Sequence, residues 1–477
     1  MRFTTAFPFV AAAVSLLTIA SCAGSTSQAA PRPSTTGAAR APNANDLYAR
    51  EVLRELIEIN TTESTGDTTR AANAVAARLR SAGFAESDVH VLGEEPRHGN
   101  LVVRLRGRGT KRPLLLLAHV DVVEAKREDW TFDPFVFREK DGFFYGRGTS
   151  DDKDMAAIFV ANMVRMKKEG FVPNRDIILA LTSGEEESTF NGVHWLLEKH
   201  RDLIDAELAL NEGGSGEIKR GKYVANEVQT SEKLFTSFEI EAKNKGGHSS
   251  LPERDNAIYR LSEALVRLSK FAFPVELNDT TRVYFERLST IEHDPDMAAV
   301  ARNGDAAAAA RLSERPFYNA TLRTTCVATL LAGGHAQNAL PQSAKATINC
   351  RILPGTDPAR VEETLRGVIG DPRVELRRLA HASAAPPSPL TPEFMAAVES
   401  ITSAMWPGVP ALPVMLTAAT DGAHLRRAGI ACYGLSGEFG DIDDVRAHGK
   451  DERVLVRSFY EGREFLDRLV RKLASAP

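Results

Sequence analysis

Cysteine is scarce in this sequence, with four residues in a chain of 477. Once Cys22 is set aside, Cys326, Cys350 and Cys432 remain, and none of them belongs to a C-x-x-C pair. An odd number leaves at least one free thiol in an oxidising compartment, and the spacing indicates neither a disulfide framework nor a cysteine metal site. We therefore assign no chemistry to these cysteines.

The sequence also lacks an excess of positive charge, because 59 Lys and Arg residues face 63 Asp and Glu residues, for a net charge of -4. A protein that binds nucleic acid normally carries a basic surface. We therefore expect no nucleic-acid partner. The apolar run near the N-terminus, Phe7 to Ala20, is too short to cross a bilayer comfortably.

The N-terminus has the features of a processing segment. Arg2 supplies a weak positive region before the apolar run, and Ile19-Ala20-Ser21-Cys22 resembles a bacterial lipobox, in which the cysteine is acylated. We expect residues 1–22 to be a lipoprotein signal peptide. The protein would then face the bacterial periplasm and contact the membrane through its lipid anchor only.

Residues 23–45 are rich in Ala, Ser, Thr and Pro and are expected to form a disordered tether. Such a tether lets an anchored domain stand away from the membrane. The alternative is an ordinary secretory signal cleaved near Ala23 or Ala30, which would leave a secreted soluble protein.

The length of the chain favours two domains. Residues 46–230 alternate between apolar strands and amphipathic helices, which indicates a mostly parallel sheet covered on both faces. Strands are expected at 100–106, 113–118, 176–182 and 207–211, and helices at 46–58, 69–82, 155–169 and 192–200.

The pattern changes near residue 231. The expected order is strand 234–243, helix 256–271, strands 324–332 and 344–353, helix 358–369 and strand 373–379, with an extra segment at about 274–321. That order is the split βαβ, or ferredoxin-like, arrangement. We therefore predict an α/β catalytic domain, residues 46–230 and 384–477, interrupted by a smaller lid or dimerisation domain at 231–383.

Polar residues follow a buried strand near position 114. Leu114 to Ala118 reads as a central strand, and His119 and Asp121 then point to the same side of an extended chain. Asp151 and Asp152 precede a helical stretch, where a carboxylate also suits the positive end of the helix. Each feature alone has an ordinary explanation, a satisfied polar residue or a helix cap.

Further ligand-type residues come after other strands. Glu185-Glu186-Glu187 follows the strand at 176–182, Glu212 follows the strand at 207–211, and His448 lies in the C-terminal part. Carboxylates gathered at one edge of a sheet repel one another unless a cation lies among them, and histidine with carboxylates suits zinc. The combined pattern predicts a metal site.

From about Asp46 to its end the sequence resembles the M20 family of zinc metallopeptidases and amidohydrolases, which includes carboxypeptidases, dipeptidases and aminoacylases. Several motifs carry the resemblance in the family's order. They are His119-Val120-Asp121, Gly146-Arg147-Gly148-Thr149-Ser150-Asp151-Asp152-Lys153, Glu185-Glu186, Asn211-Glu212-Gly213-Gly214, Gly246-Gly247-His248-Ser249 and His448-Gly449.

The resemblance implies a site with two zinc ions. His119 and Glu212 would bind one ion, Glu186 and His448 the other, and Asp151 would bridge them. Asp121 would hydrogen-bond His119 and set its tautomer, as expected beside a ligating imidazole. Glu185 would be the general base.

Two positions depart from the family pattern. Asp154 stands where the family usually has glycine, which adds a charge near the bridging carboxylate. Glu187 allows the acidic pair to shift by one residue, to Glu186 and Glu187. Counting from the preceding strand and from Asn191-Gly192 favours Glu185 and Glu186.

The inserted domain supplies three more candidates by the same resemblance. His248 would stabilise the oxyanion of the tetrahedral intermediate, often from the other subunit of a homodimer, and Asn338 and Arg351 would bind the substrate carboxylate. Without the family, His248 is a turn histidine and Arg351 a surface ion-pair partner.

These inferences predict a hydrolase that cleaves the amide bond next to a free carboxylate in dipeptides or short peptides, as a carboxypeptidase or dipeptidase does. An N-acyl amino acid deacylase shares every motif and differs in its pocket lining. A binding lipoprotein that lost its activity is the alternative from another class.

Overall fold

The computed structural model describes residues 41–186, 190–379 and 384–475. The predicted signal peptide, most of the predicted tether and Glu187 lie outside these ranges. The first helix, α1 (Ala44–Ile57), begins two residues before the expected start, because Asn43 and Asp46 form a capping box. Helix α2 (Thr68–Ser81) follows, capped by Asp67.

A large mixed sheet organises the catalytic domain. Its central strands β6, β3, β7 and β17 are parallel, and antiparallel strands extend it at both sides. This agrees with the predicted α/β class and its mostly parallel centre. The strand order is β1 (Val89–Leu92), β2 (Asn100–Leu105), β6 (Ile177–Thr182), β3 (Leu114–His119), β7 (Leu208–Asn211), β17 (Ala431–Gly434), β9 (Lys222–Glu232), β8 (Gly216–Lys219) and β18 (Phe439–Asp441), with β16 (Ala411–Leu416) also beside β9.

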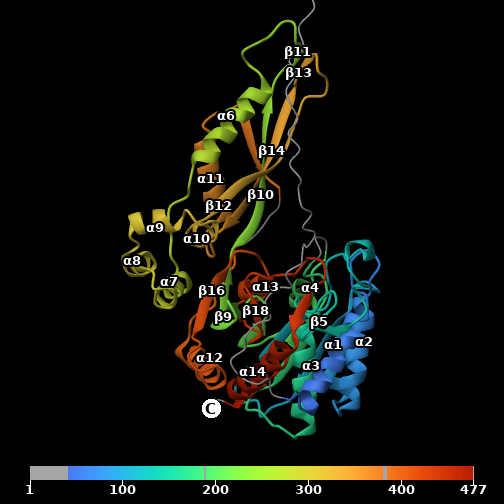
Figure 1. The fold of residues 1–477 in the computed structure, drawn as a ribbon. Coiled ribbons are helices and arrows are strands. Elements are labelled where there is room, and N and C mark those ends of the chain that lie inside the picture. Colours follow the sequence, from blue (N-terminus) through green and yellow to red (C-terminus); the bar gives the residue numbers. More distant parts are fainter. Residues whose placement is uncertain (1–40, 187–189, 380–383, 476–477) are drawn as a thin grey trace, which may run out of the picture.

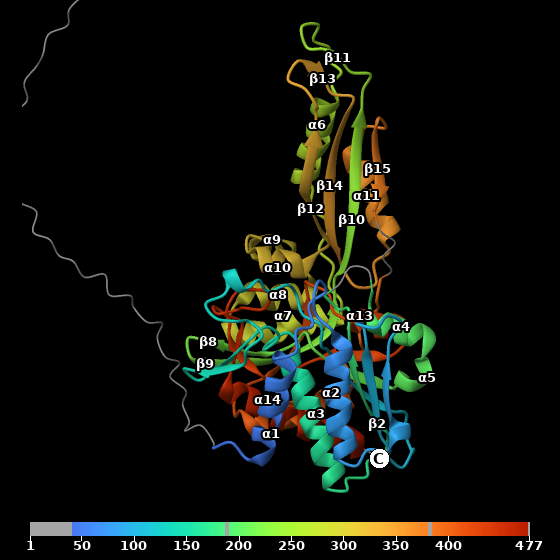
Figure 2. The ribbon, with the colours of Figure 1, turned by 90° about the vertical axis from the view of Figure 1, so that its right-hand side faces the viewer.

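Helices cover both faces of this sheet (Figure 2). One face packs against α1, α2, α3 (Lys153–Lys168), α12 (Pro392–Met405) and α14 (Val456–Ser475). The other packs against α4 (Gly192–Lys199), α5 (Arg201–Ile204) and α13 (Gly422–Arg427). Central strands enclosed in this way must be apolar on both sides, which accounts for the uninterrupted run Leu114 to Ala118.

The inserted domain extends away from the catalytic domain (Figure 1). Its antiparallel sheet has the order β12 (Thr325–Gly333), β14 (Ser343–Ile352), β10 (Leu234–Lys243) and β15 (Val374–Arg378). Helices α6 (Ala257–Lys270) and α11 (Pro358–Ile369) pack on one face, and the short strands β11 (Gly247–His248) and β13 (Ala339–Leu340) pair at the distal end. The split βαβ prediction is confirmed.

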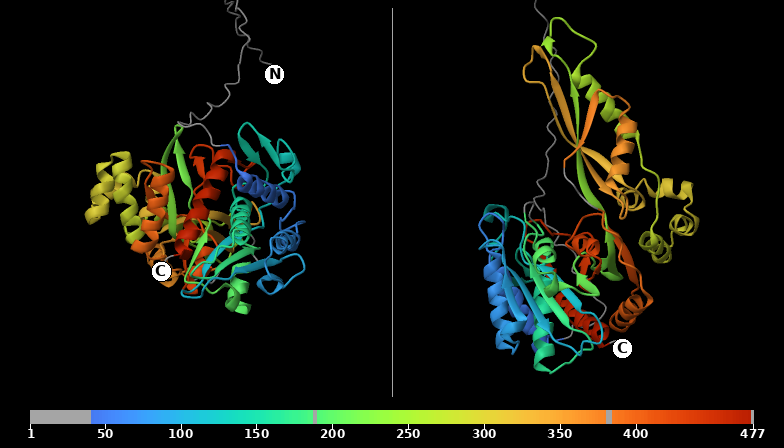
Figure 3. Two further views of the ribbon diagram at one scale, coloured as in Figure 1. Left: turned by 90° about the horizontal axis from the view of Figure 1, so that it is seen from below. Right: turned by 180° about the vertical axis from the view of Figure 1, so that it is seen from behind.

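The extra segment is helical. It contains α7 (Asp279–Glu292), α8 (Pro295–Asn303), α9 (Ala306–Leu312) and α10 (Pro316–Leu322). These helices share a core with Ala225 of β9 and with Leu412 and Val414 of β16. The segment therefore packs against the catalytic sheet, although in the sequence it lies between strands of the inserted domain (Figure 3).

One cysteine expectation is wrong. Cys326 and Cys350 form a disulfide between β12 and β14, where the two residues are register partners. Their separation of 24 residues carries no disulfide signature, because only the pairing of the two strands brings them together. Cys432 is a free, buried thiol.

Short elements complete the described chain. They are the 3-10 turns η1 (Glu86–Asp88) and η2 (Arg127–Asp129) and the small sheet of β4 (Arg138–Lys140), β5 (Phe143–Tyr145) and β19 (Arg453–Leu455). Within the described ranges, every helix is too short or too polar to cross a membrane.

Candidate metal centre

The site begins where strand β3 ends. His119 is the last residue of β3 and is almost completely buried. Its Nδ1 atom lies 3.0 Å from the carbonyl oxygen of Asp121 and 3.7 Å from the Asp121 carboxylate. The carboxylate itself accepts a hydrogen bond of 2.9 Å from the backbone N–H of Glu186. Asp121 therefore orients the ring through its carbonyl and also holds the Glu186 backbone.

Asp151 lies between two histidines. Its Oδ1 atom is 3.0 Å from Nε2 of His119, and its Oδ2 atom is 3.0 Å from Nε2 of His448. The two oxygens of one carboxylate thus face imidazoles from opposite parts of the chain. This arrangement is the one expected of a carboxylate that bridges two metal ions.

The glutamates complete the two sides of the cluster. Glu212, directly after β7, has Oε1 at 3.9 Å from Nε2 of His119. Glu186, after β6, has Oε1 at 2.7 Å from Nε2 of His448. Glu185 forms a third group with His119 and Glu186. The structure therefore brings together all seven residues that the sequence analysis assigned to the metals, the base and Asp121.

His448 reaches this edge from the far end of the chain. Strand β19 pairs with β5, which places the C-terminal segment beside the turn that carries Asp151. Asp451 accepts hydrogen bonds from the backbone and hydroxyl of Thr131, at 2.9 and 2.7 Å. The segment is therefore tied to the rest of the catalytic domain directly after His448.

The glutamates and the histidines of the cluster have raised pKa values in the absence of cations. Burial raises the pKa of Glu212 to about 8 and the pKa of Glu185 to about 10, and neighbouring carboxylates add to both shifts. Hydrogen bonding to Asp151 raises the pKa of His448 to about 9. The buried ring of His119 also has a raised pKa, because Asp121 and Asp151 outweigh the cost of burial. Without cations the cluster therefore retains protons.

These residues fit metal ions. Three overlapping groups, His119-Asp151-Glu212, His119-Glu185-Glu186 and Asp151-Glu186-His448, each have one ligand atom per residue within 4.8 Å of one another. Imidazole and carboxylate donors together suit zinc. In addition, buried Oδ1 of Asp121 and Oδ2 of Asp152 have no hydrogen-bond partner in the described part of the chain. A buried carboxylate whose oxygen lacks a hydrogen-bond partner is stabilised by nearby positive charge.

Sequence reasoning missed Asp421. This buried residue follows β16 and accepts hydrogen bonds from Asn191 Nδ2 at 2.6 Å and Thr182 Oγ1 at 3.4 Å. Burial raises its pKa to about 6, and the charge of His119 acts on it. The signal that indicated Glu186 and Glu212 was an acidic residue shortly after a strand. Asp421 carries the same signal, because it comes shortly after β16.

The departure at Asp154 has a local explanation. Asp154 is buried, and burial together with Glu438 raises its pKa well above the usual value. Burial raises the pKa of Glu438 to about 7. Two buried carboxyl groups in contact share a proton more readily than they both ionise. The raised pKa favours the neutral form of Asp154, which adds no charge near Asp151.

The three candidates in the inserted domain lie apart from the cluster. His248 is exposed in β11, and the Asn338 carbonyl accepts a hydrogen bond of 3.0 Å from Ser249 N–H. Both lie at the distal end of the inserted domain (Figure 1). Arg351 lies near the opposite end, in β14, with its guanidinium 4.7 Å from the centroid of the Phe235 ring.

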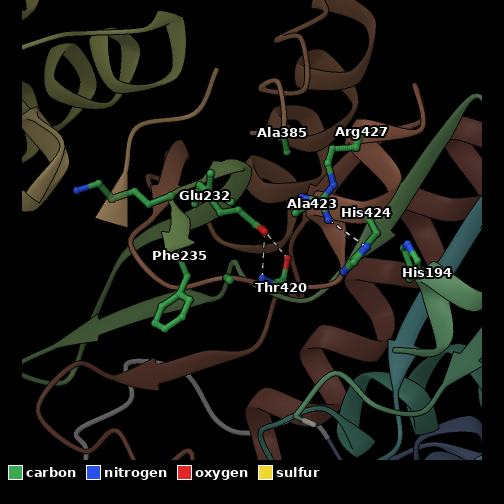
Figure 4. A pocket seen from close by; sticks show the side chains of 11 residues that line it. His194, Glu232, Phe235, Ala385, Thr420, Ala423, His424 and Arg427 are labelled. Atoms are coloured by element: carbon green, nitrogen blue, oxygen red, sulfur yellow. Dashed lines mark hydrogen bonds between the residues drawn. The ribbon is translucent and has the colours of Figure 1, made fainter. Parts of the chain in front are cut away.

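A pocket of about 390 Å³ lies where β9 continues into β10. Histidines and an arginine line one side and Phe235 the other (Figure 4). Thr420, next to Asp421, forms part of the wall. The lining residues are His194, Glu232, Lys233, Leu234, Phe235, Ala385, Ala419, Thr420, Ala423, His424 and Arg427.

Comparison with known proteins identifies the family of this chain. Residues 115–472 match the model of peptidase family M20/M25/M40. The chain is 30% identical over 358 residues to the N-fatty-acyl-amino acid synthase/hydrolase PM20D1 of Xenopus tropicalis, covering 72% of this chain and 69% of that protein. It is 28% identical over 385 residues to the probable carboxypeptidase S-like 2 of Dictyostelium discoideum, covering 76% and 71%.

The fold has solved counterparts. The M20 family metallo-carboxypeptidase Sso-CP2 from Sulfolobus solfataricus superposes with a TM-score of 0.66 at 16% identity, covering 89% of this chain and 98% of that one. At this identity the likeness concerns the fold. The family match includes His119, the acidic residues that follow β6 and β7, and His448. The chain therefore belongs to peptidase family M20/M25/M40 and is a metal-dependent hydrolase.

Proposed function

We propose that this protein uses two zinc ions to hydrolyse the amide bond next to a free carboxylate, in dipeptides or short peptides. The observation that carries the proposal is the position of Asp151, whose two oxygens each lie 3.0 Å from a histidine. His119 and Glu212 would hold one ion, and Glu186 and His448 the other. Bound zinc lowers the pKa of water and polarises a carbonyl group.

Glu185 would transfer the proton. Its carboxylate lies beside His119 and Glu186 but is not needed in either ligand set of the bridged pair. It would take a proton from the attacking water and deliver it to the departing amide nitrogen. Burial raises the pKa of Glu185 in the metal-free protein, and bound cations would lower it and leave the carboxylate ionised, as a general base must be.

N-acyl amino acid hydrolysis is a second candidate, and the relatives support both. PM20D1 of Xenopus tropicalis is named for N-fatty-acyl-amino acids, whereas the Dictyostelium relative is named as a probable carboxypeptidase. Both reactions break an amide next to a free carboxylate. A screen of zinc-loaded protein against dipeptides and N-acyl amino acids of matched C-terminal residue separates them. If neither class is cleaved, the proposed function is wrong.

We further propose a homodimer formed through the inserted domain. Strand β12 is an edge strand of its sheet, and Val327, Leu330 and Leu331 on it are 63%, 67% and 71% exposed. An apolar edge strand of this kind pairs readily with another strand. A second copy would cover it and would give His248, which is remote from its own metal cluster, access to the cluster of the other copy.

A mixing experiment tests this dimer. His248→Ala and Glu185→Gln should each be inactive, but in a mixed dimer one site receives an intact Glu185 and an intact His248. Random mixing should restore roughly a quarter of the wild-type activity, because half of the dimers are mixed and each has one complete site. No recovery, with a monomeric mass in solution, would refute the dimer.

The N-terminal sequence is the feature that bears on the location of the protein. We propose that Cys22 carries a lipid and anchors the protein to the periplasmic face of a bacterial membrane. Cys22→Ala should release the protein from the membrane fraction, whereas a secreted soluble protein would fractionate identically with and without the substitution.

A further inference from the structure

Asp421 is a buried carboxyl group to which the proposed mechanism gives no role. It lies in the connection between β16 and α13 and is 3% exposed. Its Oδ1 atom accepts a hydrogen bond of 2.6 Å from Asn191 Nδ2, and its Oδ2 atom accepts one of 3.4 Å from Thr182 Oγ1. These two donors lie at the two ends of the connection between β6 and α4, which contains Glu185 and Glu186.

Asn191 uses its whole amide group. Its Oδ1 atom accepts a hydrogen bond of 2.9 Å from the backbone N–H of His194 and so caps α4. The two hydrogens on Nδ2 are directed to two acceptors, the Asp421 carboxylate and the carbonyl oxygen of Gly184, which lies 3.2 Å away. Asp421 therefore helps to fix the position of Nδ2, and Nδ2 in turn holds the Gly184 carbonyl.

Gly184 directly precedes Glu185 and forms a tight turn. Its φ is +80°, and a Cβ atom there would lie 2.6 Å from the carbonyl oxygen of Phe190. On the other side of Glu185, the Glu186 N–H donates to the Asp121 carboxylate at 2.9 Å. The backbone of Glu185 is therefore held on one side by Asp121 and on the other by the hydrogen bond to Gly184.

Backbone contacts close the base of this connection. Gly192 N–H donates to the carbonyl oxygen of Ser183 at 2.7 Å, and Ser183 N–H donates to Asn100 Oδ1 at 3.0 Å. These bonds hold the ends of the connection but leave the Gly184 carbonyl to Asn191. Because a hydrogen bond to a carboxylate is stronger than one between neutral groups, the bond to Asp421 is the firmer of the two that Nδ2 donates.

We propose that Asp421 is a positioning residue for the general base and acts through Asn191 and the Gly184 carbonyl to hold Glu185 at the metal centre. This inference rests on the proposed function, which assigns the base to Glu185. A displacement of about 1 Å at a catalytic group lowers the rate by about a hundredfold. Glu186 has its own support from Asp121, so Asp421 should affect turnover and not metal content.

Two substitutions of Asp421 separate its hydrogen bond from its charge. Asp421→Asn keeps an acceptor for Asn191, and its amide nitrogen can donate to Thr182 Oγ1, whose hydroxyl can donate to the Ala118 carbonyl oxygen 3.5 Å away. Asp421→Ala removes the acceptor. On alanyl-leucine or N-acetyl-leucine, Asp421→Ala should lower kcat about ten- to a hundredfold with unchanged KM and metal content. Asp421→Asn should stay within about threefold of the wild-type kcat.

A double-mutant cycle shows whether Asp421 acts through Glu185. Once Glu185→Gln has removed the base, the position of that side chain no longer matters. Adding Asp421→Ala should then lower kcat by less than about twofold. A residue that only stabilised the fold would lower the rate by the same factor in both backgrounds. Losses that multiply, or a wild-type kcat in Asp421→Ala, would overturn the inference.

Asn191→Asp tests the contact with Gly184. An aspartate still caps α4, but it cannot donate to the Gly184 carbonyl. Combined with Asp421→Asn, it restores the hydrogen bond between positions 191 and 421 with donor and acceptor exchanged. The kcat of this double variant should nevertheless stay about tenfold or more below wild type, because the Gly184 carbonyl remains without its donor. Full recovery would contradict the positioning role.

Amide hydrogen exchange tests the inference without a substrate. The N–H groups of Gly192 and His194 should exchange about tenfold or more faster in Asp421→Ala than in wild type, the range of a hydrogen bond to a charged group. Asp202→Ala removes an exposed carboxylate from α5 and is the matched control, which should change neither exchange nor kcat. Thermal melting confirms that each variant is folded.

These measurements separate the inference from the proposed function. If wild type cleaves neither substrate, the proposed function fails, and hydrogen exchange still decides whether Asp421 holds the turn at Glu185. If Glu185→Gln keeps the wild-type rate, the assignment of the base is wrong. If the base is confirmed but exchange and kcat are unchanged in Asp421→Ala, the function stands and the inference fails.

Discussion

Arg147 and Glu452 form an ion pair of 2.7 Å in which both side chains are almost completely buried. Glu452 also accepts hydrogen bonds from the backbone N–H groups of Gly148 and Ser150, at 3.0 and 2.8 Å. Arg147 donates in turn to the carbonyl oxygen of Gly449, at 3.1 Å. The pair therefore joins the turn before Asp151 to the segment that carries His448.

Loss of this pair should destabilise the protein. Arg147→Met leaves the Glu452 carboxylate buried without its cation and should lower the free energy of unfolding by about 3–5 kcal/mol. Chemical denaturation measures the change. Lys140→Met, an exposed lysine in the neighbouring strand β4, is the control and should change stability by less than about 0.5 kcal/mol. A loss below 1 kcal/mol in Arg147→Met would contradict the role of the pair.

The metal content should follow the two ligand sets. Protein purified without chelators should contain about two zinc ions per chain, and His448→Ala should contain about one, because the substitution removes a direct ligand. Elemental analysis measures the content. His335→Ala, an exposed histidine in the inserted domain, should keep both ions. A fully active preparation without metal would exclude the proposed chemistry.

Glu185 and Glu186 should respond differently to the same substitution. Glu185→Gln should keep both ions while kcat falls by about two to four orders of magnitude, the range typical of general acid-base catalysis. Glu186→Gln should lose metal instead. The measurements are steady-state kinetics and metal analysis of the same preparations. If Glu186→Gln kept both ions and lost only rate, the acidic pair would be Glu186 and Glu187.

Zinc binding should release protons near pH 7. In the metal-free protein the pKa values of His448 and Glu212 are raised to about 9 and about 8, so both groups are mostly protonated at this pH. Metal ligands must lose these protons, and the apparent affinity for zinc should therefore rise with pH between about 6 and 9. Calorimetry in buffers of different ionisation enthalpy counts the protons. Binding without proton release would show that the groups are already ionised.

Much of the fold was predictable from the sequence. The uninterrupted apolar run before His119 predicted a buried parallel strand, and the order of strands and helices after residue 231 predicted the split βαβ domain. Both predictions depend on patterns within a few consecutive residues. The extra segment was harder to place, because its partners in β9 and β16 lie far from it in the chain.

The sequence by itself indicated the family, because its motifs occur in the family's order, and the resemblance implied the residues of the candidate metal cluster. Tertiary structure alone decided which of them face one another across Asp151, that Cys326 joins Cys350, and that His424, Arg427 and Phe235 line one pocket. The physical reason is that these contacts join residues from separate helices and strands. Their distances depend on strand pairing and helix packing, which a local sequence pattern does not predict.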